Sequence, residues 1–178
     1  MSNWFVFYVQ TGREQAACDF LNKLLNQDES TAFIPQVELI FKNSKFIRKE
    51  LKPMFPGYIF TDSILDERSF INQAYKYVRF SNCIFKLLGK ENVEYMKLSE
   101  EEKNFLLGFY GEEYVAEESK GFINGDKIVI TSGPLKGKES IIKKIDRHKR
   151  RAEIELICFG DKRRINVSLE ILSKVVLV

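Results

Sequence analysis

The chain has 178 residues, 44% of them hydrophobic, enough to bury the core of one domain or of two small ones. No run of about 18 apolar residues and no basic leader is present, so we expect a cytoplasmic protein without a membrane span or a signal peptide. The cysteines, Cys18, Cys83 and Cys158, are odd in number, far apart and without a histidine cluster. This argues against a disulfide framework and a zinc site, and we expect no metal and no cofactor.

The formal net charge of +3 conceals a difference between the two ends of the chain. From Phe122 onward there are 13 basic and 7 acidic residues, whereas the residues before it carry more acidic than basic groups. Many of those acidic groups lie between Glu100 and Glu118. An excess of positive charge in one region indicates a polyanionic partner such as a nucleic acid.

The first element expected is a buried central strand at residues 3–10, NWFVFYVQ, because the run is dense in aromatic and β-branched residues. It ends at Thr11 and Gly12, and a helix should follow. Apolar residues in that helix recur at spacings of three and four, which places them on one face for packing against a sheet. They are Ala17, Phe20, Leu21, Leu24 and Leu25.

Two strands are expected at residues 31–42 and 45–52, joined at Asn43 and Ser44. Another strand, GYIFT, should follow the Phe-Pro-Gly corner at residues 55–57.

Two more helices are expected before residue 110. The first lies near residues 66–77, and residues 78–89 should return as an extended segment. The second helix follows Ser99, because Ser99 and Glu102 have the spacing of a capping box. Its apolar face would be formed by Phe105, Leu106 and Phe109.

A domain boundary is predicted at GEEYVAEESKG, residues 111–121, which is acidic and has no sustained apolar period. Residues 1–111 mix strands and helices, and residues 112–121 would form a flexible acidic linker. Residues 122–178 contain short strands separated by turn residues, which predicts a small five-stranded β-barrel. Its strands are DKIVIT, KESIIKKID, RAEIELICF, KRRINVSL and SKVVLV. The fold class is therefore α+β.

The segment SGPLKGKES, residues 132–140, has the glycines and lysine of a phosphate-binding loop without its spacing. Only three residues separate Gly133 from Gly137, and Glu139 stands where a hydroxyl would be needed. The isoleucines that follow predict a strand rather than a helix. We therefore expect a hairpin connection in which Pro134 presets φ and the glycines adopt angles that other residues resist.

The order of these segments and several motifs resemble the NusG family of transcription elongation factors. WFVFYVQTGRE resembles the family's first strand and turn, KPMFPGYIF its Phe-Pro-Gly-Tyr segment, and GDKIVITSGPLKGKESIIKKID its KOW motif. The tail FGDKRRINVSLEILSKV resembles the closing strands. The combination, in this order over nearly the whole chain, is more specific than any single motif.

The resemblance implies an N-terminal domain with a mainly antiparallel sheet flanked by helices, a linker, and an SH3-like KOW barrel. It implies a monomer that binds the clamp coiled coil of RNA polymerase, raises its processivity and recruits a ribosomal or other transcription protein through the barrel. The GPLKGKE turn and the basic IDRHKRRAEIEL segment resemble the specialised antiterminators of the LoaP and RfaH type. That likeness implies antitermination directed to particular operons by a nascent RNA hairpin or by upstream or non-template DNA.

The residues that the resemblance assigns to polymerase binding are aromatic or lie at the Phe-Pro-Gly corner, since a coiled-coil tip is recognised by apolar anchors. They are Tyr8, Phe55, Pro56, Tyr58 and Phe60. The alternative for each aromatic residue is packing in the core.

The residues expected to bind nucleic acid are cations in two segments, together with Arg13 after the first strand. The segments are Lys42, Lys45, Arg48, Lys49 and Lys52 in the first, and Arg147, His148, Lys149, Arg150 and Arg151 in the second. The sequence does not choose between them as the reader of RNA. The alternatives are a solvated hairpin tip for the first segment and a protein contact for the second.

Two other functions compete with specialised antitermination. A housekeeping elongation factor would act at every operon and couple polymerase to a ribosomal or termination protein. A ribosome-associated protein would use the barrel for rRNA, which leaves the N-terminal domain without a role. We expect no enzyme, because acid pairs such as Glu112 and Glu113 fall in the expected linker and no nucleophile sits in a recognisable motif.

Overall fold

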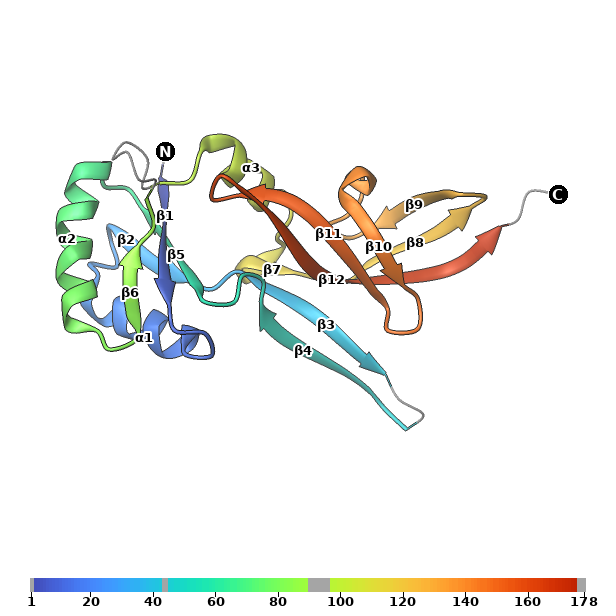
Figure 1. Ribbon diagram of the computed structural model, residues 1–178, viewed down its shortest axis with the longest axis horizontal. Coiled ribbons are helices and arrows are strands. Elements are labelled where there is room, and N and C mark those ends of the chain that lie inside the picture. Colours follow the sequence, from blue (N-terminus) through green and yellow to red (C-terminus); the bar gives the residue numbers. More distant parts are fainter. Residues whose placement is uncertain (1, 43–44, 90–96, 176–178) are drawn as a thin grey trace. The chain divides into compact units, whose positions relative to one another are not determined.

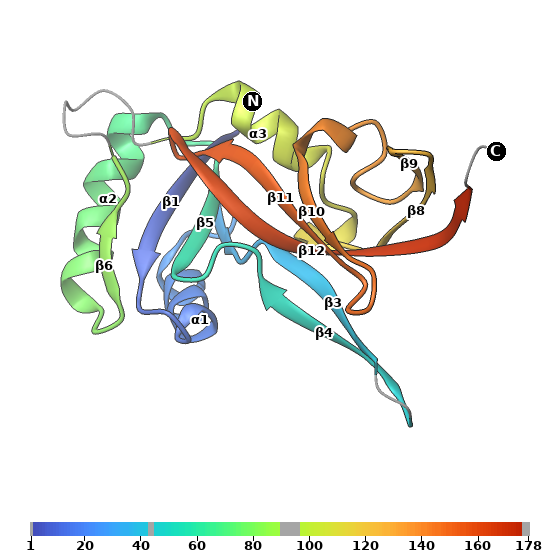
Figure 2. The same ribbon diagram turned by 45° about the vertical axis from the view of Figure 1, so that its right-hand side comes forward.

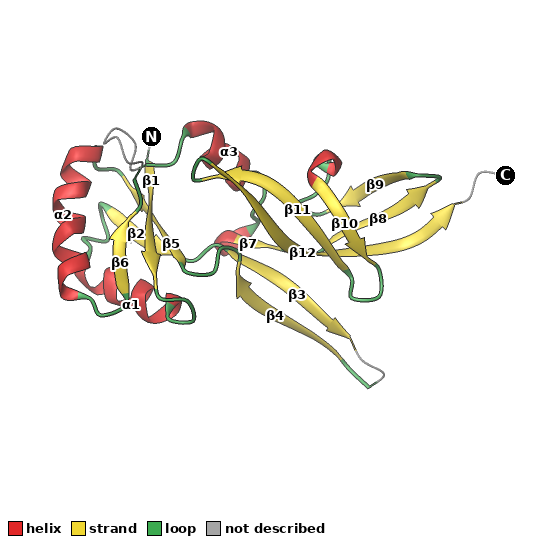
Figure 3. Cartoon of the chain, viewed as in Figure 1, coloured by secondary structure: helices red, strands yellow, loops and turns green. Residues whose placement is uncertain are grey.

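The computed structural model describes residues 2–42, 45–89 and 97–175 and separates into two compact units. The first unit comprises Met1–Pro35 and Phe55–Lys103, and the second comprises Gln36–Met54 and Asn104–Val178. Figure 1 follows the chain by colour, and Figure 3 marks its helices and strands. Within the described residues, no helix is both long and apolar enough to cross a membrane.

The first unit is a four-stranded antiparallel sheet with the strand order β2-β5-β1-β6, accompanied by helices. Its elements are β1 (Asn3–Val9), α1 (Glu14–Leu24), β2 (Ser30–Phe33), β5 (Tyr58–Ser63), α2 (Glu67–Phe80) and β6 (Ile84–Leu87), and α3 (Glu100–Leu107) begins in it. The strand β1 pairs with both β5 and β6, so the prediction of a central strand is confirmed.

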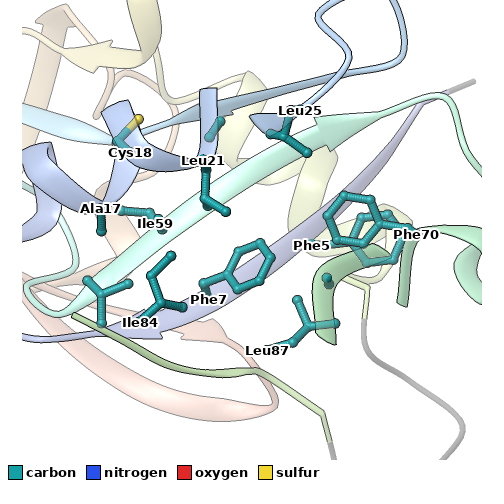
Figure 4. Close-up of a cluster of buried hydrophobic side chains, with 13 residues drawn as sticks. Phe5, Phe7, Ala17, Cys18, Leu21, Leu25, Ile59, Phe70, Ile84 and Leu87 are labelled. Carbon is teal, nitrogen blue, oxygen red and sulfur yellow. The ribbon is translucent and has the colours of Figure 1, made fainter. Parts of the chain in front are cut away.

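The core of the first unit is formed by every second side chain of β1, together with side chains of β5 and the helices. Phe5 and Phe7 project from β1 toward the helices, where they join Leu21 of α1 and Phe70 of α2 in a buried cluster (Figure 4). The rings of Phe5 and Phe70 stack with centroids 3.9 Å apart. Successive strand residues point to opposite faces, so the intervening residues of β1, including Tyr8, lie on the other face of the sheet.

Side-chain caps mark the start of two helices, and the one at Ser99 was predicted. The Asp66 carboxylate accepts hydrogen bonds from the Ser69 hydroxyl and from the Ser69 backbone N–H at the start of α2, and these bonds hold the pKa of Asp66 below its usual range. At α3, the Ser99 backbone N–H donates to the Glu102 carboxylate and the Glu102 N–H donates to the Ser99 hydroxyl, so the predicted capping box is confirmed.

The second unit holds two sheets. A three-stranded sheet has the order β4-β3-β7, and a five-stranded sheet has the order β10-β11-β12-β8-β9. The elements are β3 (Gln36–Lys42), β4 (Ile47–Pro53), η1 (Glu112–Tyr114), β7 (Val115–Ala116), β8 (Ser119–Asn124), β9 (Lys127–Ser132), η2 (Glu139–Ile141), β10 (Ile142–Asp146), β11 (Arg151–Cys158) and β12 (Asp161–Val175). The α+β class is confirmed, and the predicted domain limits at residues 111 and 121 stay a prediction.

Four predictions about the limits of elements were wrong. The strand expected at residues 31–42 is two strands, β2 and β3, because Pro35 lies between them and cannot donate to a ladder. The helix α2 continues to Phe80, since Tyr77 and Val78 still pack against the core cluster. Residues 162–169 and 173–175, from the last two strands expected in the C-terminal region, belong to one long strand, β12, and residues 176–178 lie outside the described residues. The strand β8 precedes the first strand expected there.

The connection at residues 133–138 does not close a hairpin, contrary to expectation, because β9 and β10 lie at opposite ends of the strand order. It instead inserts Leu135, which is fully buried and whose backbone N–H donates to the Ser119 hydroxyl at 3.0 Å. Gly133 has φ +89°, and a Cβ atom there would lie 2.5 Å from the Ser119 Cα. Gly137 has φ +73° but no atom within 4 Å of such a Cβ.

Alanine at these two glycines should therefore have unequal effects on stability. Gly137→Ala should lower the free energy of unfolding by about 1–2 kcal/mol, the cost of the left-handed backbone conformation. Gly133→Ala should cost clearly more, because the backbone of β8 must also move. Urea unfolding of the full chain measures both, and equal losses would show that the close approach to Ser119 contributes nothing.

Candidate functional site

The first predicted basic segment lies on the antiparallel ribbon of β3 and β4. Cross-strand pairing sets Phe41 opposite Arg48 and Ile40 opposite Lys49, so Arg48 and Lys49 lie on opposite faces of the ribbon. All five cations of the segment are exposed, and they are Lys42, Lys45, Arg48, Lys49 and Lys52. The segment therefore presents positive charge on two faces rather than along a single rim.

Carboxylates of the same ribbon neutralise part of this charge. Arg48 and Lys52 both form ion pairs with Glu50. The Lys49 Nζ donates to the Glu38 Oε1 at 2.9 Å, and this hydrogen bond raises the pKa of Lys49. Exposed pairs of this kind contribute little to stability, and they exchange readily for other anions.

The second predicted basic segment is the turn from β10 to β11. Arg147, His148 and Lys149 are exposed on it, and the Lys149 backbone N–H donates to the Asp146 carboxylate at 3.0 Å. Arg150 closes the turn with φ 51°. The segment thus holds its exposed side chains on a turn with defined backbone hydrogen bonds.

Arg150 has a different environment from its neighbours. Its guanidinium donates two hydrogen bonds of 3.0 Å to the Glu118 carboxylate and lies 2.8 Å from a carboxylate oxygen of Glu170. Burial raises the pKa of the Glu118 carboxyl, and the positive charge of Arg150 acts in the opposite direction. A bidentate pair of this kind fixes the Arg150 side chain, so its charge is directed at the protein.

Arg151 joins the two basic segments. Its guanidinium carbon lies 4.7 Å from the centroid of the Phe41 ring, and that of Arg48 lies 5.9 Å from the same centroid. Both distances suit a cation–π interaction. Arg151 also donates to the Ile40 carbonyl, so the turn and the ribbon meet through a ring, two cations and a backbone oxygen.

A buried serine fixes the ribbon to the five-stranded sheet. The Ser168 hydroxyl on β12 accepts a hydrogen bond of 3.2 Å from the Ile40 backbone N–H and donates one of 2.7 Å to the Glu38 carbonyl. Ser168 is almost completely buried. Its hydroxyl satisfies two backbone groups of β3 that would otherwise lose hydrogen bonds on burial.

The two predicted basic segments therefore line one pocket, of about 770 Å³, within the second unit. Figure 2 shows the β3–β4 ribbon and the elements β10, β11 and β12 that contribute to it. Its charged walls hold Lys42, Arg48, Lys144, Lys149, Arg151 and His148 against Asp146 and Glu153, and its other walls include Phe41, Phe46 and Asn166. The sequence predicted most of the cations but not Phe41, which lies on the ribbon itself, nor Lys144 and Asn166, which only the folded chain brings to the ribbon.

Exposed aromatic residues gather on the first unit. Register pairs Tyr8 of β1 with Tyr58 of β5, and their ring centroids lie 5.4 Å apart. The ring centroid of Phe85 on β6 also lies 5.4 Å from that of Tyr8. The pairing of β1 with β6 skips Phe85, which is the extra residue of a bulge, and its side chain is 53% exposed. This bulge has no clear sequence signal, so Phe85 was missed. We call Tyr8, Tyr58 and Phe85 the aromatic surface.

The remaining residues predicted to bind polymerase differ in exposure. Pro56 is exposed at the corner before β5, whereas Phe55 and Phe60 are buried and their ring centroids lie 5.7 Å apart. The corner is held by Glu14 of α1, a buried residue whose carboxylate accepts a hydrogen bond of 2.8 Å from the Gly57 N–H. Phe55 and Phe60 are thus core residues next to this corner.

Arg13 lies just before α1 in the first unit, with an exposed side chain. It thus belongs to a different unit from the cations of the pocket. Across the described ranges 2–42, 45–89 and 97–175, no group of three or more histidine, cysteine, aspartate or glutamate residues could hold a metal ion.

Known proteins with similar sequences or folds all carry the name NusG. A family model described as "Transcription termination factor nusG" matches residues 2–107. The transcription termination/antitermination protein NusG of Thermus thermophilus is 24% identical over 166 residues, which cover 88% of this chain and 90% of that protein. The Rickettsia typhi protein of the same description is 22% identical over 180 residues, covering 98% and 91%.

A solved structure described as "Domain interaction in Thermotoga maritima NusG" aligns with a TM-score of 0.53. It is 21% identical to this chain, and the alignment covers 96% of this chain and 94% of the other. The likeness therefore extends to the fold of nearly the whole chain.

Removing the Ser168 hydroxyl should weaken the attachment of the ribbon. Ser168→Ala leaves the Ile40 N–H and the Glu38 carbonyl without this partner, which should lower the free energy of unfolding by about 1–3 kcal/mol. Ser132→Ala, at an exposed serine at the end of β9, is the matched control and should change it little. Urea unfolding compares them, and equal stability of the two variants would contradict this role for Ser168.

Proposed function

Because the chain belongs to the NusG family of transcription factors, we propose that it is an antitermination factor that binds RNA polymerase and is directed to particular operons by nascent RNA. The observation that carries the RNA part is the meeting of both basic segments and an exposed aromatic residue, Phe41, in one pocket. The likeness to termination/antitermination proteins supports the transcriptional role.

The aromatic surface is the contact that we propose for RNA polymerase. Apolar partners such as the tip of a coiled coil are recognised by large aromatic side chains that become buried on binding. The Tyr8 ring contacts those of Tyr58 and Phe85, all three side chains are at least partly exposed, and Pro56 is exposed at the neighbouring corner. The buried Phe55 and Phe60 would act by holding that corner in place.

The ribbon and the β10–β11 turn are the contact that we propose for nucleic acid. Their exposed cations can neutralise phosphates, and arginine can also stack on or hydrogen-bond to bases. The side chains of Lys42, Lys45, Arg147 and Lys149 are exposed, whereas Arg150 is only partly exposed and is paired with two carboxylates of its own unit. Arg150 would therefore contribute through the shape of the turn.

A protein contact is proposed for the C-terminal strands. Ile157 on β11 and Leu172 on β12 are large apolar residues with more than half of their surface exposed. Each could contribute an apolar contact to a ribosomal or transcription protein. This contact would operate alongside RNA binding.

Truncating the aromatic surface should weaken polymerase binding. Tyr8→Ala and Phe85→Ala should each raise the dissociation constant for core RNA polymerase by about tenfold or more, the typical loss at a central interface aromatic. Tyr75→Ala, at an exposed tyrosine on α2, is the matched control and should bind as the wild type does. Fluorescence anisotropy measures this, and unchanged affinity of both variants would reject the aromatic surface as the contact.

Antitermination should depend on the native operon leader and on the pocket cations. In vitro transcription through a terminator placed downstream of that leader should show readthrough with the wild type, and Lys42→Ala/Lys149→Ala should reduce it severalfold because phosphate contacts are lost. The control Lys23→Ala/Lys76→Ala changes the net charge equally at exposed helical positions of the first unit.

The same assay on templates with an unrelated leader tests whether readthrough depends on the native leader. Readthrough that is equal on every template would contradict specialised antitermination and support a housekeeping elongation factor. Equal loss in the two double variants would show that net charge, rather than the pocket, accounts for the effect.

A further inference from the structure

We propose that the pocket formed by the β3–β4 ribbon and the β10–β11 turn accepts one unpaired RNA nucleotide, with its base against Phe46 and Phe41 and its phosphates beside the lysines. This inference rests on the proposed RNA contact and adds the structural form of the RNA that is recognised. A bulged or looped nucleotide would be bound in preference to a continuous duplex.

The dimensions of the pocket suit a single nucleotide. A volume of about 770 Å³ lies within the range of about 300–1,000 Å³ that is usual for small-molecule sites. In a continuous RNA duplex the bases remain stacked, and the major groove is too deep and narrow for side chains to read. A base must therefore leave the helix before it can enter the pocket.

The apolar wall of the pocket suits a base. Phe46 is 54% exposed and Phe41 is 37% exposed, although both carry large apolar rings. Exposed aromatic rings within a basic groove bind single-stranded nucleic acid by stacking on its bases. The guanidinium groups of Arg48 and Arg151 lie over the Phe41 ring, so beside Phe41 a base would stack on these planar cations, next to the exposed ring of Phe46.

The polar walls suit the backbone of the same nucleotide. Lys42 enters from the ribbon and Lys144 from β10, and within the described residues neither forms an ion pair. Lys149 is only loosely paired, with its Nζ 3.8 Å from Asp146. Three ammonium groups, from β3, from β10 and from the β10–β11 turn, can therefore approach the phosphates of one nucleotide.

The acceptors in the pocket favour RNA over DNA. Glu153 of β11 and Asn166 of β12 are cross-strand partners, so their side chains lie on the same face and reach the pocket together. Each offers an oxygen that can accept a hydrogen bond. A ribose 2′-hydroxyl can donate such a bond, and DNA has no equivalent donor.

The test uses the full chain and three probes. These are a short RNA hairpin with one bulged 2-aminopurine in its stem, the same RNA without the bulge, and the DNA equivalent of the bulged hairpin. Anisotropy gives the dissociation constants at moderate salt, and the 2-aminopurine fluorescence reports stacking of the bulged base. The variants are Phe46→Ala, Phe46→Tyr and Lys42→Ala.

The wild type should bind the bulged RNA about tenfold more tightly than the other two probes and quench its 2-aminopurine. Phe46→Ala should remove that preference and the quenching without changing the affinity for the continuous stem, and Phe46→Tyr should restore both. Lys42→Ala should weaken both RNAs by a similar factor, because a phosphate contact is insensitive to base stacking.

Several results would overturn the proposal, and they separate it from the proposed function. Equal binding of bulged and continuous RNA, unaffected by Phe46→Ala, rejects the nucleotide pocket and leaves the RNA contact standing. Binding of neither RNA rejects both. Equal binding of bulged RNA and bulged DNA rejects the RNA assignment, and displacement by free AMP at concentrations that leave the continuous stem bound assigns the pocket to a soluble nucleotide.

Discussion

The candidate nucleic-acid site depends on one buried hydroxyl. Ser168 bonds to the N–H of Ile40 and the carbonyl of Glu38, so it fixes the position of β3 along β12. A strand that is held by both donor and acceptor cannot slide without leaving backbone groups unsatisfied, which costs more than the bonds themselves contribute. The alignment then brings Phe41 to Arg151, and the two basic segments meet.

Some charged side chains of the second unit form partly buried ion pairs, and others are exposed to solvent. Arg150 is held by Glu118 and Glu170 in the least exposed ion pairs of the basic turn, whereas Lys149 remains largely in solvent. Because Arg150 and Glu118 are largely shielded from solvent, removing either one would leave the other charge without its partner. Arg150 is therefore bound to its carboxylates more firmly than an exposed cation would be. Adjacent residues of one charged run thus have different roles, and the difference arises from their surroundings rather than their type.

The first unit shows a comparable division among its aromatic residues. Phe5 and Phe7 pack against helices, while Tyr8, one residue further along β1, lies on the opposite face beside Tyr58. The strand periodicity of two produces this separation. A bulge then adds Phe85 to the exposed group, so a small irregularity of pairing extends a surface that regular pairing would leave smaller.

Features that depend on near neighbours could be predicted from the sequence: the central strand β1, the capping box of Ser99 and Glu102, the α+β class and the two basic segments. Propensity, periodicity and capping act over a few residues, so they can be read along the chain. Tertiary contacts were needed to show that the segments share a pocket, that Arg150 is paired with two carboxylates and that Phe85 joins Tyr8. These depend on hydrogen bonds between residues more than a hundred positions apart and on strand register, which no local pattern specifies.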